Sequence, residues 1–114
     1  MMNVRFEVRE GRGIITVTGA LNAACVDSFR DQFYRWITEN EAVHQIVLDV
    51  AAMDFIDSAG LGVLIALLKR VSERGGDIRI ARLQKKARVV FEITRAYKIF
   101  EIFDSVEEAL KSKA

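Results

Sequence analysis

The chain has 114 residues, and its seventeen basic and sixteen acidic side chains leave a formal net charge of +1. This length matches the size of one domain, so we expect a single domain over residues 1–114. The balanced charge excludes the broad electrostatic attraction that nucleic acids and anionic lipids exert, so we expect a protein or small-molecule partner and no direct nucleic acid contact.

The sequence also indicates where the protein works. Cys25 is the only cysteine, which excludes an internal disulfide bond and favours a reducing compartment. The first nine residues alternate apolar and charged side chains, a strand pattern that lacks the apolar block of a secretory signal. The longest apolar stretch, residues 59–68, is about half as long as a membrane-spanning helix. We therefore expect a soluble, cytoplasmic protein with no membrane insertion.

The first part of the chain predicts a hairpin followed by a helix. Residues 4–9 alternate apolar and charged side chains and predict a strand with one solvent-exposed face, and residues 10–13 predict a turn. Residues 14–18 are rich in β-branched side chains and predict a second strand that pairs back on the first. Asn22 is the expected cap of the first helix, because apolar side chains then recur every three or four positions from Val26 to Ile37.

The middle of the chain predicts a buried strand, a loop and a second helix. Residues 45–50 are nearly all apolar, which is the composition of a strand buried on both faces. Residues 51–57 predict a loop. The second helix is expected to begin near Ser58 and to end before the glycine pair at residues 75–76.

The last third of the chain predicts a strand, a third helix, a short strand and a terminal helix, over residues 77–81, 86–97, 99–103 and 106–110. The apolar side of the third helix is expected to consist of Val89, Val90, Ile93 and Tyr97. The order ββαβαβα, followed by a strand and a helix, predicts the α/β class with a mostly parallel sheet of about four or five strands. The N-terminal hairpin makes this sheet mixed.

Ser58 stands at the predicted start of the second helix, where the first amide groups have no partner within the helix. One interpretation is that its hydroxyl caps the helix by accepting one of these hydrogen bonds. A second is that Ser58 is a phosphorylation site, since a phosphate there adds about −1.5 to −2 charges at the positive end of the helix dipole. The two interpretations are compatible, because a capping serine can also be modified.

Two glycines in the same turn, Gly60 and Gly62, leave a further choice open. Glycine costs up to about 1 kcal/mol relative to alanine in a helix, so these residues fit either tight packing on the sheet or close approach by a partner or a kinase. The second helix is apolar on more than one side. One apolar stripe comprises Leu61, Leu64, Ile65, Leu68 and Val71, and two further apolar residues, Val63 and Leu67, lie outside this stripe. Such a helix either lies deep in the core, which is the favoured explanation, or keeps a patch for a partner.

Residues 57–64, Asp-Ser-Ala-Gly-Leu-Gly-Val-Leu, resemble the signature of the STAS domain of anti-sigma factor antagonists, Asp-Ser-(Ser/Ala)-Gly-Leu-Gly-x-(Leu/Ile). Further similarity lies in residues 18–22, 46–49, 75–76 and 105–110, so the likeness covers essentially the whole chain. The resemblance implies the STAS fold, with helices packed mainly on one face of the sheet, in a monomer or weak dimer.

The resemblance also implies partner switching. The unmodified protein would bind an anti-sigma factor that is also a serine kinase, and would thereby free the sigma factor. The kinase would phosphorylate Ser58 with ATP and magnesium, which ends the complex, and a phosphoserine phosphatase would restore the serine. The implied partner-binding residues are Asn22, Asp57, Ser58, Ala59, Gly60, Leu61 and Gly62. The alternative is a STAS subunit of a lipid transporter or of a stress-signalling scaffold.

The sequence departs from the family pattern at a few positions. Asn22 replaces the usual Asp near the acceptor serine, which would either change kinase recognition or be neutral, because Asn caps helices as well as Asp. Residues 94–97, Thr-Arg-Ala-Tyr, stand where Thr-Gly-Leu is common, and we expect them to affect packing or partner choice.

Catalytic and metal-binding functions are not expected. A serine hydrolase places glycine two residues before its nucleophile, where Ile56 stands, and the only histidine, His44, precedes the third strand. One cysteine and one histidine cannot form a typical zinc site. We therefore expect no catalytic residue, no metal and no cofactor. A basic cluster precedes and begins the third helix and comprises Arg82, Lys85, Lys86 and Arg88. We expect it to be a solvent-exposed surface, or at most a docking patch for the partner.

Overall fold

The computed structural model describes residues 2–111 and contains a five-stranded sheet in the order β1-β2-β3-β4-β5. The strands are β1 (Asn3–Arg9), β2 (Arg12–Leu21), β3 (Gln45–Ile56), β4 (Asp77–Ala81) and β5 (Ile102–Phe103). The helices are α1 (Val26–Glu39), α2 (Ser58–Glu73), α3 (Lys85–Ile93) and α4 (Val106–Lys111), with a short 3-10 helix η1 (Ala96–Lys98). β1 and β2 are antiparallel and the other neighbours are parallel, which confirms the predicted mixed α/β sheet.

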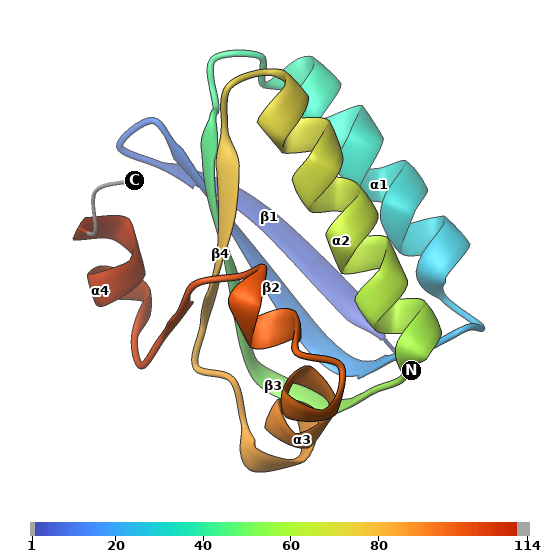
Figure 1. The fold of residues 1–114 in the computed structure, drawn as a ribbon. Helices are drawn as coiled ribbons and strands as arrows, with labels where there is room; N and C mark the ends of the chain where they lie inside the picture. The colour runs from blue at the N-terminus through green and yellow to red at the C-terminus, as the bar shows by residue number, and fades with distance from the viewer. Residues whose placement is uncertain (1, 112–114) are drawn as a thin grey trace.

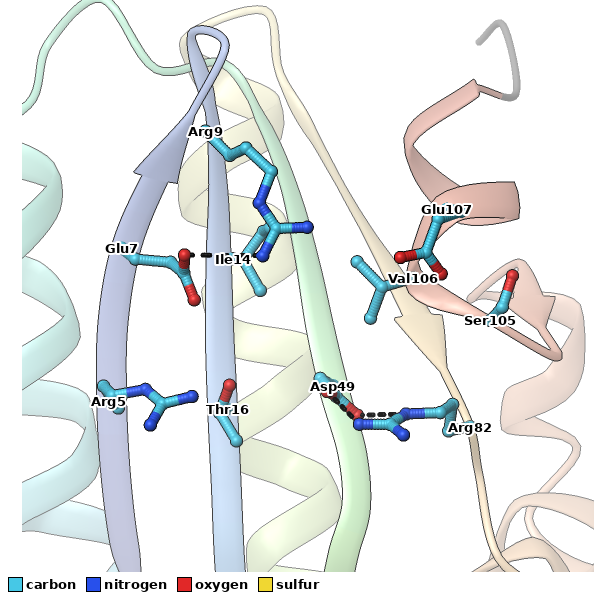
Figure 2. A pocket seen from close by; sticks show the side chains of 10 residues that line it. All are labelled: Arg5, Glu7, Arg9, Ile14, Thr16, Asp49, Arg82, Ser105, Val106 and Glu107. Carbon is cyan, nitrogen blue, oxygen red and sulfur yellow. Dashed lines mark hydrogen bonds and ion pairs between the residues drawn. The ribbon is translucent and has the colours of Figure 1, made fainter.

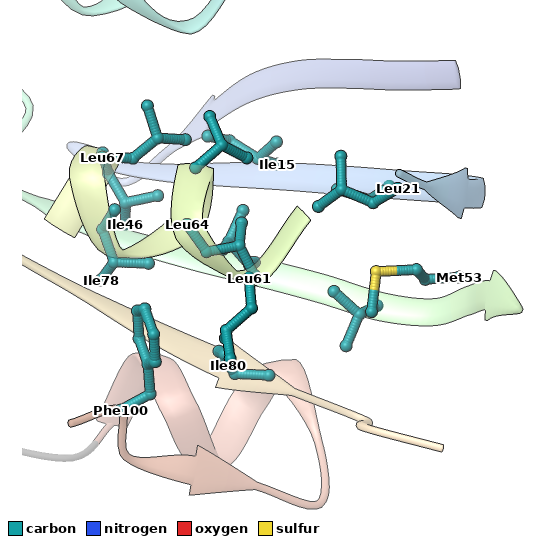
Figure 3. Packing of buried hydrophobic residues seen from close by; sticks show 14 of the residues in the cluster. Ile15, Leu21, Ile46, Met53, Leu61, Leu64, Leu67, Ile78, Ile80 and Phe100 are labelled. Atoms are coloured by element: carbon teal, nitrogen blue, oxygen red, sulfur yellow. The ribbon is translucent and has the colours of Figure 1, made fainter. Parts of the chain in front are cut away.

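The helices cover both faces of the sheet unequally. α1 and α2 lie side by side on one face, and α4 lies on the opposite face (Figure 1). Phe33 of α1, Leu67 of α2 and Phe91 of α3 belong to one large buried cluster, part of which Figure 3 shows. Val106 and Ala109 of α4 belong to a smaller cluster on the other face. Three of the four helices therefore pack into the same core layer.

β3 is the centre of the sheet and is longer than predicted. Ile46 and Leu48 belong to the large cluster and Val47 to the small one, so the prediction of a strand buried on both faces is confirmed. The predicted loop over residues 51–57 is wrong, because β3 continues to Ile56. β2 is also longer than predicted, and its second half supplies the hydrogen-bond partners that keep this part of β3 extended.

The third helix is shorter than predicted and turns a different side to the core. α3 ends at Ile93, and Arg95 then adopts a left-handed backbone conformation with φ 61°, which stops the helix before η1. Its buried residues are Ala87 and Phe91, whereas Val89 and Ile93 are exposed. The predicted apolar side is therefore not the side that packs on the core: Phe91 is buried there, and three of the four predicted residues are exposed.

The remaining elements agree with the predictions in kind. The hairpin, α1, β4 and α4 all form where the sequence places them. β5 is reduced to Ile102–Phe103, shorter than the predicted residues 99–103. In the part of the chain that the structure describes, no helix has both the length and the apolar character that crossing a membrane requires.

Candidate functional site

The candidate site lies where β2 and β3 end and α2 begins. Leu21 and Ile56 pair as the last residues of the two parallel strands, so the segments that follow them leave the same edge of the sheet. Residues 22–25 connect β2 to α1, and Asp57 connects β3 to α2. Two segments that are far apart in the sequence thereby become neighbours.

Asp57 joins these two segments through its carboxylate. Oδ1 accepts a hydrogen bond from the amide of Gly60 at 2.8 Å, which makes Asp57 the N-cap of α2. Oδ2 accepts a hydrogen bond from the amide of Ala23 at 3.2 Å, and the Asp57 amide donates to the carbonyl oxygen of Leu21 at 3.3 Å. The carboxylate thus fixes the first turn of α2 to the loop that follows β2.

Ser58 is the first residue of α2 and is exposed. The prediction that its hydroxyl caps the helix is wrong, because Asp57 has the extended backbone of an N-cap, with φ −111° and ψ −174°, and already binds the Gly60 amide. Within residues 2–111 the Ser58 hydroxyl makes no hydrogen bond. It is therefore a free hydroxyl at a surface, available for chemical modification.

Asn22 lies beside this site but does not cap α1. The N-cap of α1 is Cys25, which makes no side-chain capping hydrogen bond. The Oδ1 atom of Asn22 instead accepts a hydrogen bond from the Ala24 amide at 3.0 Å, which closes a local turn. The turn delays the start of the helix, so the capping prediction is wrong, and it places the loop against Asp57 through Ala23.

Gly60 and Gly62, near the start of α2, differ in the space that surrounds them. A Cβ atom at Gly60 would overlap the carbonyl oxygen of Leu21, so glycine there allows α2 to pack tightly on the end of β2. A Cβ atom at Gly62 would meet nothing within 4 Å, and the residue is exposed. Packing explains Gly60 and leaves Gly62 unexplained within the chain.

The remaining residues around the serine divide between the surface and the core. Leu61 is buried, and Ala59 is half-buried. Among the large apolar residues of α2, those that are buried are Leu61, Val63, Leu64, Leu67 and Val71. Val63 and Leu67 thus face the core although they lie off the predicted stripe, while Ile65 and Leu68 are only half-buried. The core explanation for the apolar surface of α2 is confirmed.

Phe55 is a surface residue at this site that the sequence analysis missed. It lies two residues before Asp57 at the end of β3, and half of its surface is exposed, at 50%. A signal was present: successive side chains of a strand point to opposite faces, so Phe55 and Ile56 cannot both enter the same core. Ile56 is buried, and Phe55 is left at the surface.

The start of α2 attracts negative charge, and the histidine of the chain lies far from it. The amide groups at the start of a helix lack intrahelical partners and attract negative charge. The Asp57 carboxylate already binds one of them, and the first turn of α2 itself contains no acidic residue. His44 precedes the start of β3, whereas Ser58 follows its far end. The histidine therefore cannot take the proton of the serine hydroxyl.

A separate hollow of about 310 Å³ lies on the sheet face that carries α4 (Figure 2). The guanidinium of Arg82 donates two hydrogen bonds to the carboxylate of Asp49, at 3.0 and 2.6 Å, and Arg9 pairs with Glu7 at 3.5 Å. The hydrogen bond and the charge of Asp49 raise the pKa of Arg82. These four charges are paired, and the other two charged residues that line the hollow, Arg5 and Glu107, have opposite signs, so the hollow has no net charge.

Comparison with known proteins places this site in a family context. The family model described as "STAS domain" matches residues 3–109. An anti-sigma F factor antagonist from Paenibacillus polymyxa is 29% identical over 111 residues, covering 96% of this chain and 94% of the relative. A crystal structure of a putative anti-sigma factor antagonist from Thermotoga maritima has a TM-score of 0.87 at 23% identity, with 95% and 92% of the two chains covered.

SpoIIAA, an anti-sigma factor antagonist from Bacillus, has been solved in unphosphorylated and phosphorylated forms. Both forms give a TM-score of 0.71 at 21% identity over 95% of this chain, with 94% and 96% of their own chains covered. The family match runs from β1 into α4 and includes both segments that meet at Asp57. The chain therefore belongs to the STAS domain family.

Proposed function

We propose that this protein is an anti-sigma factor antagonist that works by partner switching. In its unphosphorylated form it binds an anti-sigma factor that is also a serine kinase, and so frees the sigma factor. Phosphorylation of Ser58 ends the complex, and a phosphoserine phosphatase restores it. The observation that carries the proposal is the exposed Ser58 hydroxyl, free of hydrogen bonds within residues 2–111, at the start of α2. The names of the relatives support it.

The proposed contact surface is centred on the exposed side of the first turns of α2. Ser58 and Gly62 lie four residues apart and therefore on the same side of the helix. Phe55, three residues before Ser58 at the end of β3, adds an exposed aromatic ring, a residue type that interfaces favour. Asn22 and Ala59 lie at the margin. Gly60 and Leu61 are buried, and Asp57 is held by two hydrogen bonds, so these three position the surface more than they touch the partner.

The phosphoryl transfer leaves little chemistry for this chain to perform. The bond between the γ-phosphorus and the bridging oxygen of ATP breaks, a bond from phosphorus to Ser58 Oγ forms, and ADP leaves. The hydroxyl proton passes to a base that the kinase supplies, because His44 lies at the other end of β3. What this chain contributes is an uncovered hydroxyl on a rigid helix.

A single phosphate is sufficient to switch the affinity. It adds about −1.5 to −2 charges, which the helix dipole tolerates in the free protein. At the centre of an interface the same charge is desolvated without a partner, at a cost of several kcal/mol. Each 1.4 kcal/mol corresponds to about tenfold in affinity, so the complex dissociates while the fold is unchanged.

The test compares variants of Ser58 for binding to the cognate kinase, measured by isothermal titration calorimetry. We expect Ser58→Ala to bind persistently in the presence of ATP and magnesium, and Ser58→Asp and Ser58→Glu to bind poorly. Ser72 is an exposed serine near the other end of α2, so Ser72→Ala and Ser72→Asp provide matched controls with wild-type affinity. Equal affinity for all Ser58 variants would contradict the proposal, as would mass spectrometry that finds Ser58 unmodified beside its active kinase.

A further inference from the structure

Exposed apolar side chains are concentrated on one part of this molecule. Among residues 2–111, four of the six exposed large apolar residues belong to α3, η1 and the residue that follows: Val89, Ile93, Tyr97 and Ile99. Ile93 is 78% exposed. The same segment also contains five basic residues: Lys85, Lys86, Arg88, Arg95 and Lys98. We call these nine residues the α3 surface. Scattered exposed apolar residues are normal, but a cluster of this kind marks an interaction site.

The charge of the protein is also concentrated here. Residues 84–99 contain the five cations and one carboxylate, Glu92, so this segment carries a net charge of +4. The whole chain carries +1, so the other residues sum to −3. A charge separated in this way attracts an acidic partner and steers its approach.

The α3 surface is shaped as well as charged. Two hollows of about 400 and 460 Å³ adjoin it, and Arg88, Tyr97 and Ile102 line both of them. Hollows next to an exposed tyrosine and a half-buried arginine can receive side chains from a partner, and these residue types dominate the binding energy of many interfaces.

The α3 surface adjoins the second half of β3, the strand that leads to Ser58. A further hollow of about 450 Å³ separates the second half of β3 from the start of α3, with lining residues 51–54 on one side and 84–86 on the other. Lys85 and Lys86 belong to both this hollow and the α3 surface. Phe55 and then Ser58 follow along the chain, so the α3 surface and Ser58 both lie toward the carboxyl end of β3.

We propose that the α3 surface is a second contact for the kinase that phosphorylates Ser58, that it binds an acidic segment with an apolar face, and that it determines which kinase this chain recognises. The inference rests on the proposed function. Around Ser58 the chain presents mostly small side chains, among them Gly62, Ala23 and Ala24, which offer little by which one kinase differs from another. Large apolar and cationic side chains can be matched by one partner and mismatched by another.

Charge argues against two other occupants. A second copy docked symmetrically would place the same patch on both sides, so five cations would face five cations. An anionic lipid surface would suit the cations, but Glu92 on α3 and Glu101 beside Tyr97 would face the headgroups. An acidic protein segment can arrange its charges around both carboxylates.

The test measures binding to the cognate kinase in the presence of ADP, with every variant carrying Ser58→Ala so that phosphorylation cannot intervene. We expect Ile93→Glu to weaken the affinity by about tenfold or more and Lys86→Glu by at least about threefold. The affinity for a non-cognate anti-sigma kinase should not fall with Ile93→Glu. Both side chains are exposed, so equal melting temperatures for all variants are expected and show that the fold is kept.

Two matched controls lie outside the α3 surface. Val8→Glu introduces the same charge at an exposed apolar residue of β1, and Lys111→Glu reverses an exposed cation on α4. We expect either control to change the affinity by less than about twofold. If Ile93→Glu and Lys86→Glu bind the kinase as the controls do, the α3 surface is not a contact and the inference is overturned.

The remaining outcomes separate this inference from the proposed function. If the affinity for the kinase changes with substitutions at Ser58 but not with substitutions in the α3 surface, the proposed function is supported and only the inference is overturned. A kinase that does not bind the wild-type chain overturns both. A dimer in sedimentation that Ile93→Glu dissolves would assign the surface to a second copy. Binding to phosphatidylserine vesicles that Ile93→Glu abolishes would assign it to a membrane, and either result overturns the inference.

Discussion

Gly62 lies one helical turn after Ser58 on the exposed side of α2, with open space where its side chain would be. Side chains of an α-helix lean toward the N-terminus of the helix, over the preceding turn. A side chain at position 62 would therefore extend over the serine. Glycine leaves the hydroxyl uncovered, at a cost in helix stability that no contact within residues 2–111 explains.

Gly62→Leu is expected to slow phosphorylation of Ser58 by about tenfold or more, because the leucine covers the hydroxyl that the kinase must reach. The variant should remain folded, since a Cβ atom at this position meets no neighbour. The rate is measured by mass spectrometry with purified kinase and ATP. Ser72→Leu, which places a leucine at another exposed position of the same helix, should leave the rate unchanged. A wild-type rate for Gly62→Leu would contradict this role of the glycine.

Substitution by alanine should change the free energy of unfolding in opposite directions at Gly60 and at Gly62. Gly60→Ala is expected to lower the free energy of unfolding by about 1–3 kcal/mol, because its Cβ atom overlaps the Leu21 carbonyl oxygen and α2 must move. Gly62→Ala should raise it by up to about 1 kcal/mol, because alanine is the better helix former and has room. Urea denaturation of both variants checks this, and changes of the same sign would refute it.

The fold could be predicted from the sequence wherever one side chain pattern dominated. The apolar run at residues 45–50 and the alternation at residues 4–9 each allowed one interpretation, and both strands form. α3 allowed two, since Val89 with Ile93 and Ala87 with Phe91 are both spaced four residues apart. The choice between them depends on which side chain fills the core of the folded protein, and a periodicity contains no such information.

The site shows the same limit at the scale of one residue. Sequence places Asp57 and Ser58 at a helix start, but which of them accepts the Gly60 hydrogen bond depends on backbone angles that the strand before them imposes. The pairing of Leu21 with Ile56 brings the loop at residues 22–25 to Asp57, and such long-range register cannot be read from local pattern. The family resemblance, carried by residues 57–64, located the serine itself.

Asp57→Ala is expected to lower the free energy of unfolding by about 1–3 kcal/mol, because it removes the cap of α2 and the hydrogen bond from Ala23 together. Asp57→Asn keeps an oxygen for the Gly60 amide and should cost less. Ser58→Ala, one residue later, should change stability by less than about 0.5 kcal/mol, because its hydroxyl makes no hydrogen bond within residues 2–111. Thermal melting distinguishes the three, and an equal loss for Ala at both positions would argue against the assigned cap.

Asn22→Asp should affect phosphorylation more than stability. An aspartate oxygen can still accept the hydrogen bond from the Ala24 amide, so we expect the free energy of unfolding to stay within about 0.5 kcal/mol of wild type. The new carboxylate lies in the loop that Asp57 holds beside Ser58, where it changes the charge that the kinase meets. A shift in melting temperature with an unchanged phosphorylation rate would show that Asn22 serves only the turn.

Arg82 combines an ion pair with a strained backbone, and two substitutions separate these effects. Its φ is 64°, in the left-handed region that only glycine adopts without cost, and its guanidinium binds the buried carboxylate of Asp49, which is 7% exposed. Arg82→Ala and Arg82→Gly both remove the ion pair, but only glycine relieves the backbone. We expect Arg82→Ala to be less stable than Arg82→Gly by about 1 kcal/mol in urea denaturation. Equal stabilities would mean that the backbone at residue 82 relaxes once the guanidinium no longer holds it against Asp49.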